Sequence, residues 1–208
     1  MRVLASLLVV AAFVVGVVSF QVKERAPEGG IAADTLERAF APGGQIHMDL
    51  SAGQYRIEGS PDEKIRIHWS TGDSRRRRVD VTADVRGNEA KLTADGPSRR
   101  LRVRIEVPSR SDVEIRMTAG ELAVRGIEGN KDVELHAGEL DLDVGRAEDY
   151  ERVHATVWAG DLHARPFQVV KEGLFRSFHW EGRGKYQLRA HIKAGELRMS
   201  SSSPETSK

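Results

Sequence analysis

Apolar and polar residues alternate along most of the chain between positions 45 and 199. A period of two places every second side chain on the same face of an extended strand, so the pattern predicts β-strands. One short phrase recurs within this region, in which alanine and glycine precede a polar or acidic residue and then an apolar one. Its five copies span residues 51–55, 118–122, 136–140, 158–162 and 193–197. Such repeats predict a stack of similar units.

The alternation changes phase at the glycine of each copy. Leu135 to Ala137 and Leu140 to Leu142 are steps of two, whereas Ala137 to Leu140 is a step of three. A strand must bend to allow this shift, and glycine permits the backbone angles of a bulge or corner. Each unit is therefore expected to be a strand, a corner, a second strand and a turn. The predicted corners are Gly53, Gly120, Gly138, Gly160 and Gly195.

The spacing of these glycines indicates how the units stack. It is 18 residues from Gly120 to Gly138, 22 from Gly138 to Gly160 and 35 from Gly160 to Gly195. The last gap is about two turns of one coil, with a degenerate rung near residues 175–178. The sequence therefore predicts an all-β, single-domain β-solenoid, or stacked β-roll, of about eight to twelve short strands.

Residues 3–20 form an apolar, uncharged run that only Met1 and Arg2 precede. An N-terminal transmembrane anchor fits because the run is just long enough to span a bilayer. A signal peptide fits as well, although the run lacks an Ala-x-Ala cleavage triplet. We expect residues 1–20 to be this export segment, 21–44 a linker, 45–199 the β-solenoid domain and 200–208 a disordered tail. Either form of export places the domain outside the cytoplasm, in the cell envelope or secreted.

Charge and cysteine content exclude several classes of function. The 32 basic and 31 acidic residues leave a formal net charge of +1, which gives no general attraction to nucleic acid. The absence of cysteine excludes disulfides, thiolate nucleophiles and zinc–cysteine sites. No motif indicates a cofactor.

Residues 101–108 form an alternating strand that ends in Val107-Pro108, and Ala-Gly-Glu-Leu units follow it. This arrangement resembles the bacterial putative-adhesin family, over roughly residues 45–199. The resemblance implies a single-sheet or rolled β-solenoid at the cell envelope, and it supplies no catalytic or binding residues. The chain departs from the family pattern in having alanine before the glycine in all five copies.

Stacking the copies in register predicts a column of acidic side chains. Glu121, Glu139 and Asp161 would share it, and Glu196 would continue it beyond the degenerate rung. Like charges on neighbouring strands repel, so either a calcium ion or nearby Arg and Lys side chains must neutralise them. Ion pairing is the favoured alternative, because the glycine-aspartate calcium repeat is missing. In the next column, Asp143 would lie between Arg125 and Arg165.

Four consecutive arginines, Arg75, Arg76, Arg77 and Arg78, form the centre of the only strongly basic region. They are a candidate anion-binding site for lipid headgroups or acidic glycans, or else a solvated loop. The histidines lack metal-ligand spacing, although His154 and His163 could approach each other. Aromatic residues concentrate in the C-terminal half, where they would either form a binding strip or cap the core.

These observations favour a non-catalytic structural or interaction module of the cell envelope. The expected partner is an envelope protein or a glycan, together with the membrane itself if residues 3–20 are retained. Two alternatives stay open. Glu139, Asp141 and Asp143 share one strand face, as the carboxylates of a solenoid carbohydrate-active enzyme would. A membrane-anchored sensor domain would instead act through a partner protein.

Overall fold

The residues that the structure describes fold into one open sheet of twelve strands, which confirms the all-β prediction. This computed structural model describes residues 32–71, 79–96 and 101–201. The strands are β1 (Ala32–Ala39), β2 (Gln45–Leu50), β3 (Gly53–Ser60), β4 (Lys64–Thr71), β5 (Asp80–Arg86), β6 (Glu89–Asp95), β7 (Leu101–Pro108), β8 (Asp112–Arg125), β9 (Lys131–Asp143), β10 (Tyr150–Ala164), β11 (Val169–Glu181) and β12 (Tyr186–Ser200). Two short 3-10 helices, η1 (Ala147–Asp149) and η2 (Arg165–Phe167), flank β10.

The expected export segment, residues 3–20, lies outside the described residues. Within those residues, no helix has the length and apolar character needed to cross a membrane.

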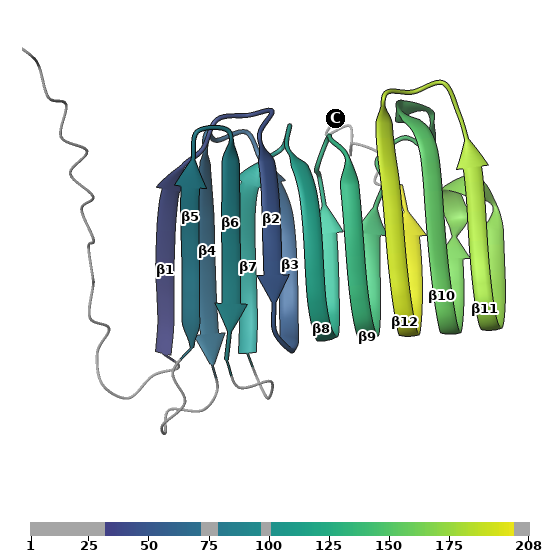
Figure 1. The fold of residues 1–208 in the computed structure, drawn as a ribbon, viewed down its shortest axis with the longest axis horizontal. Coiled ribbons are helices and arrows are strands. Elements are labelled where there is room, and N and C mark those ends of the chain that lie inside the picture. Colours follow the sequence, from purple (N-terminus) through teal and green to yellow (C-terminus); the bar gives the residue numbers. More distant parts are fainter. Residues whose placement is uncertain (1–31, 72–78, 97–100, 202–208) are drawn as a thin grey trace, which may run out of the picture.

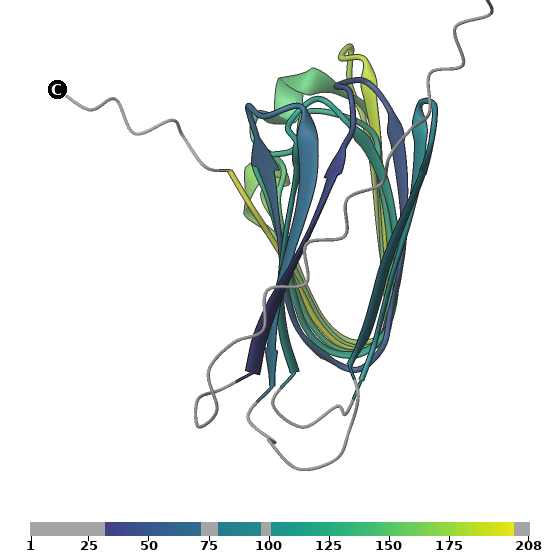
Figure 2. The ribbon, with the colours of Figure 1, turned by 90° about the vertical axis from the view of Figure 1, so that its left-hand side faces the viewer.

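The sheet folds back on itself to form two facing layers (Figures 1 and 2). The first half of β8 pairs with β2, and its second half pairs with β3. The first layer therefore contains β5, β6, β2 and the N-terminal halves of β8, β9, β12 and β10. The second layer contains β1, β4, β7, β3 and the C-terminal halves of the same long strands. Strand β11 runs antiparallel to β10 at one end of the stack.

The hydrophobic core fills the space between the two layers. In β8, the buried side chains are Val113, Ile115 and Met117 before the bend and Leu122 and Val124 after it. The inward positions thus change from odd to even numbers across the bend. This is the phase shift that the sequence pattern shows, and it keeps apolar side chains facing inward on both layers.

Glycines lie side by side at the bend. Gly120, Gly138, Gly195 and Gly160 occupy matching positions on β8, β9, β12 and β10. Their φ angles are 119°, 134°, 136° and 130°, a region that L-residues rarely adopt. A Cβ atom on any of them would also overlap the carbonyl oxygen of the neighbouring glycine. We call this row the glycine ladder, and both its backbone angles and its close approach require glycine.

The remaining predicted corner differs from the other four. Gly53 pairs with Gly120 and begins β3, but it does not have a positive φ. Ser51 and Ala52 separate β2 from β3 here, so the first copy of the repeat turns between two strands instead of within one.

The order in which the copies stack differs from the predicted coil. Strand β12 lies between β9 and β10, so Gly195 stands between Gly138 and Gly160. Residues 175–178 belong to β11, which forms an antiparallel edge next to β10 and not a rung between Gly160 and Gly195. The prediction of stacking in sequence order is therefore wrong for the last copy. All copies share the same short phrase, so the phrase does not determine which of them become neighbours.

The linker predicted over residues 21–44 contains a strand. Residues 32–39 form β1, which pairs antiparallel with β4, and Phe40 is buried in the core. The sequence signal is weak because Leu36 is the only one of the described β1 side chains that packs against the core. Backbone pairing with β4, rather than a clear apolar period, defines β1.

A buried lysine and tyrosine lie between the layers near their open ends. Lys131 begins β9, is 2% exposed, and donates a hydrogen bond from Nζ to Tyr150 Oη at 2.6 Å. Burial lowers the pKa of Lys131 to about 8. Burial also raises the pKa of Tyr150 above its ordinary value of 10.0. The sequence pattern missed this pair because the charged residue occupies an inward position of an otherwise apolar strand.

Replacing a ladder glycine should destabilise the fold more than replacing a turn glycine. We expect Gly138→Ala to lower the free energy of unfolding by about 3 kcal/mol or more, because it adds both backbone strain and a clash with Gly120. Gly145 is the matched control, with a φ of 63° and open space around its Cβ position, and Gly145→Ala should cost about 1–2 kcal/mol. Urea unfolding measures both, and equal losses would contradict the ladder.

Stability should depend on pH through Lys131 and Tyr150. Between about pH 8 and 10, the unfolded chain keeps the Lys131 proton that the folded protein has lost, so stability rises with pH. Above about pH 10, the unfolded Tyr150 loses a proton that the folded protein keeps, so stability falls. Relative to Lys131→Met, the free energy of unfolding should rise by on the order of 1–2 kcal/mol from pH 8 to 10. Parallel pH profiles for the two proteins would refute this assignment.

Candidate binding face

The outward side chains of the second layer form straight rows across neighbouring strands. The row after the ladder contains Arg102 of β7, Gln54 of β3 and Glu121 of β8, each opposite the next. It continues through Glu139, Glu196, Asp161 and Glu172 on β9, β12, β10 and β11. Neighbouring strands are about 4.8 Å apart, so the row is a regular line of charges.

The structure brings the four predicted acidic residues together, in a different order, and adds one more. Glu121 lies opposite Glu139 as expected, but Glu196 stands between Glu139 and Asp161 because β12 is inserted there. Glu172 of the edge strand extends the row. The five carboxylates form what we call the acidic row.

Arg198 supplies the positive charge at the centre of the acidic row. Its Nε donates to Glu196 Oε1 at 2.6 Å, and Nη2 pairs with the same carboxylate. Nη1 lies 3.3 Å from Glu139 Oε2 and 3.9 Å from Asp141 Oδ1. The hydrogen bond to Glu196 raises the pKa of the guanidinium. Ion pairing thus neutralises the middle of the row, whereas Asp161 and Glu172 have no ion-pair partner among the described residues.

A groove of about 600 Å³ crosses the outer face of the second layer between β1 and β9. Arg102 and Arg125 line it, and neither has an ion-pair partner within the described part of the chain. Glu121 lines the same groove and accepts a hydrogen bond from Gln54 at 3.1 Å. Glu139 and Asp141 complete the acidic side. Arg102 Nε donates a hydrogen bond to Gln54 Oε1 at 3.0 Å. The groove therefore presents two arginines without a carboxylate partner among the described residues, together with carboxylates.

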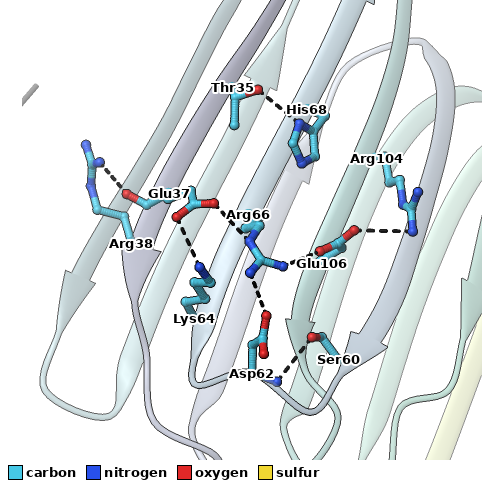
Figure 3. Close-up of polar contacts among 10 residues, drawn as sticks. All are labelled: Thr35, Glu37, Arg38, Ser60, Asp62, Lys64, Arg66, His68, Arg104 and Glu106. Atoms are coloured by element: carbon cyan, nitrogen blue, oxygen red, sulfur yellow. Dashed lines mark hydrogen bonds and ion pairs between the residues drawn. The ribbon is translucent and has the colours of Figure 1, made fainter. Parts of the chain in front are cut away.

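A network centred on Arg66 fixes the strands beside the groove (Figure 3). Its Nε, Nη1 and Nη2 atoms lie 2.9, 2.9 and 2.6 Å from Glu37 Oε1, Glu106 Oε2 and Asp62 Oδ2. The hydrogen bond to Glu106 is the main cause of the raised pKa of Arg66. Arg104 joins the network through Glu106 at 3.2 Å. These contacts tie β1, β4 and β7 together at the edge of the sheet.

Some predicted residues do not take the positions expected of them. Arg75, Arg76, Arg77 and Arg78 lie outside the described residues. Asp143 lies opposite Ser200 of β12, so Arg165 is not on the next strand, and the predicted ladder through Asp143 is wrong there. Asp143 is instead buried and accepts a hydrogen bond from the backbone N–H of Gly145 at 2.8 Å.

The histidines also pair differently from the prediction. His154 contacts His179 of β11, with ring centroids 4.5 Å apart, instead of His163. Desolvation and the charges of His179, Arg189 and His191 lower the pKa of His154. No group of three or more His, Cys, Asp or Glu side chains suited to a metal ion occurs in the part of the chain that the structure describes.

The aromatic residues divide between the core and the surface. Phe167 packs against Phe178 and Trp180, with ring centroids 5.3 and 5.1 Å apart, and closes the β11 end of the core. Trp158 and Phe175 instead form an exposed pair, 5.9 Å between ring centroids. The sequence left capping and surface exposure as alternatives, and the structure contains both.

The fold of this chain is similar to that of a solved bacterial protein structure. No family model matches the chain, and no curated protein matches it. A putative cell adhesion protein from Clostridium sporogenes is similar in structure, with a TM-score of 0.55 and 14% identity over 82% of this chain and 100% of that one. A putative adhesin from Bacteroides fragilis has a TM-score of 0.35 and 10% identity, over 81% of this chain and 97% of that one. The likeness to the Clostridium sporogenes protein confirms the resemblance to the putative-adhesin family at the level of fold.

Removing the central arginine should expose the repulsion within the acidic row. We expect Arg198→Ala to lower the free energy of unfolding by about 1 kcal/mol at low ionic strength, with a smaller loss in high salt. Arg146 is the matched control, because its contact with Glu148 is 3.9 Å long and both side chains are largely exposed. Arg146→Ala should change stability by less than about 0.5 kcal/mol. A salt-independent loss for Arg198→Ala would show that packing, not charge, is responsible.

Proposed function

We propose that this chain is a non-catalytic, adhesin-like interaction module of the cell envelope, with a solenoid-like stack as its scaffold. The groove on the outer face of the second layer is its binding site. The observation that carries this proposal is that Arg102 and Arg125, which have no ion-pair partner among the described residues, line one groove of the sheet together with Glu121, Glu139 and Asp141. Envelope localisation rests on the apolar run at residues 3–20.

The charge pattern favours a protein segment over a glycan as the partner. Arg102 and Arg125 attract anionic groups, whereas Glu121 and Glu139, which line the same groove, repel them. An acidic glycan carries one sign of charge along its length, so it would meet the repulsive glutamates as well as the attractive arginines. A protein segment that carries acidic and basic side chains can match each side of the groove.

The surroundings of Glu139 and Asp141, two of the three acids that suggested an enzyme, support a non-catalytic role. A general acid requires burial that favours its protonated form. Glu139 and Asp141 are about half exposed, and both lie beside the Arg198 guanidinium. Their surroundings support a role in charge matching.

A photo-crosslinking residue in the groove tests the proposal. We would place it at Ala123, which lines the groove, in the full chain expressed in its native envelope. Thr82 is the matched control, because it is exposed on the first layer. A discrete protein adduct at position 123, and none at position 82, is expected. Arg102→Glu with Arg125→Glu should reduce this adduct at least five-fold.

Other outcomes distinguish the alternatives. Equal adducts at both positions, or none at position 123, would eliminate the groove as the binding site. A heterogeneous adduct that a glycosidase removes would replace the protein partner with a glycan.

A further inference from the structure

Exposed apolar side chains gather at one edge of the sheet. Trp158, Val170, Leu174 and Phe175 are 56%, 61%, 63% and 73% exposed, and they are the large hydrophobic residues exposed in the described part of the chain. All belong to β10 or β11. Strand β11 ends the stack opposite β1 and β5 (Figure 1). Its outer edge therefore combines apolar side chains with backbone groups that no neighbouring strand pairs, and Lys171 Nζ donates a hydrogen bond to one of these groups, the Ser177 carbonyl.

The strands at the opposite end of the stack carry protective charges. On β1, the exposed side chains include Asp34 and Glu37, and β5 exposes Asp80, Asp84 and Arg86. Charged side chains on short edge strands discourage pairing with another chain. At 13 residues, β11 is longer than β1 (8 residues) or β5 (7 residues). Strand β11 also exposes charged side chains, Lys171, Glu172 and Glu181, so its length and its exposed apolar residues are what distinguish it as the edge available for pairing.

We propose that β11 is a self-association surface, where two copies of the chain join edge to edge around a two-fold axis. Each copy has two layers joined by a bend (Figure 2). The two-fold axis runs from the bend towards the open ends, midway between the layers. A half-turn about this axis therefore exchanges the positions of the two layers. The two β11 strands then meet antiparallel, with the first layer of one copy continuing into the second layer of the other. The same surface serves on both copies, as a two-fold interface requires.

Side-chain direction restricts the register of this pairing. Glu172 and Val170 point outward on the second layer, opposite Asp161 and His163 of β10. Ser177 and His179 point outward on the first layer, opposite Thr156 and His154. Residues that face each other in a ladder point to the same side. Glu172 of one copy must therefore lie opposite an outward residue of the other.

One of the allowed registers also places chemically compatible side chains opposite each other. With Glu172 opposite Ser177 of the second copy, Leu174 meets Phe175 twice at the two-fold axis. A shift by two residues in one direction would set Lys171 opposite Arg176. A shift in the other direction would set Val170 opposite Glu181. The register with the apolar centre avoids both mismatches.

The backbone at this centre is specialised. Phe175 has a φ of 54°, which is rare for an aromatic residue, and its exposed ring packs on Trp158. Strained residues of this kind often mark binding sites. Here the strain holds a large apolar ring at the edge where the second copy would cover it.

A second copy fits this edge better than a membrane surface. Val170 lies on the second layer, away from the Trp158–Phe175 pair at the bend, so the exposed apolar groups follow the strand and not one tip. Glu172 and the neighbouring Asp161 lie on the same edge and would repel anionic lipid headgroups.

Engineered cysteine pairs test the proposal, because the chain has no cysteine of its own. In the full chain, Glu172→Cys with Ser177→Cys should give disulfide-linked dimers in native envelope preparations under mild oxidation. The two positions lie on opposite layers of one copy with their side chains pointing outward, away from each other, which disfavours an internal disulfide. Glu172→Cys with His179→Cys is the register control, and Asp80→Cys with Asp84→Cys is the control at the other end. Both should give at least five-fold less dimer.

Adding Leu174→Lys to the Glu172→Cys, Ser177→Cys pair should reduce the dimer at least ten-fold without changing the thermal midpoint, because Leu174 is exposed. Dimer yields equal to those of the controls would overturn the proposal. So would a monomer whose binding to phosphatidylcholine–phosphatidylglycerol vesicles is lost with Leu174→Lys, which would assign the edge to a membrane surface.

Discussion

The close approach of neighbouring glycines at the bend is the constraint on which the rest of the structure depends. Gly120, Gly138, Gly195 and Gly160 leave no room for a Cβ atom and adopt a backbone region that other residues rarely enter. Because they lie side by side, the long strands bend at the same level. The two layers therefore face each other, and the alternating side chains enclose one continuous core.

The same register determines the outer surface. Once the glycines align, the residues that follow them align as well, and the five carboxylates of the acidic row become neighbours. Arg198 offsets their repulsion at the centre. Towards β3 and β7 the row continues with the neutral Gln54 and the cationic Arg102, so the groove is lined by charges of both signs. The features of the proposed binding site thus follow from the packing at the bend.

The sequence predicted the strands, the bend and the acidic residues because each leaves a local signal. It did not predict the position of β12, because the copies share one phrase and their order depends on long-range pairing. Arg198, two residues after Glu196, is the one feature of the sequence that indicates a place for this copy beside Glu139. Strand β1 and the buried Lys131 were missed because tertiary contacts, not periodicity, position them.

Native-state amide hydrogen exchange tests the central role of the bend most directly. If the glycine ladder holds the layers together, the amides at Gly120, Gly138 and Gly195 should exchange as slowly as those of the core strands, and with a common free energy of opening. Fast exchange at these glycines, with slow exchange in the strands on either side, would show that the layers are stable without the ladder and would contradict this account.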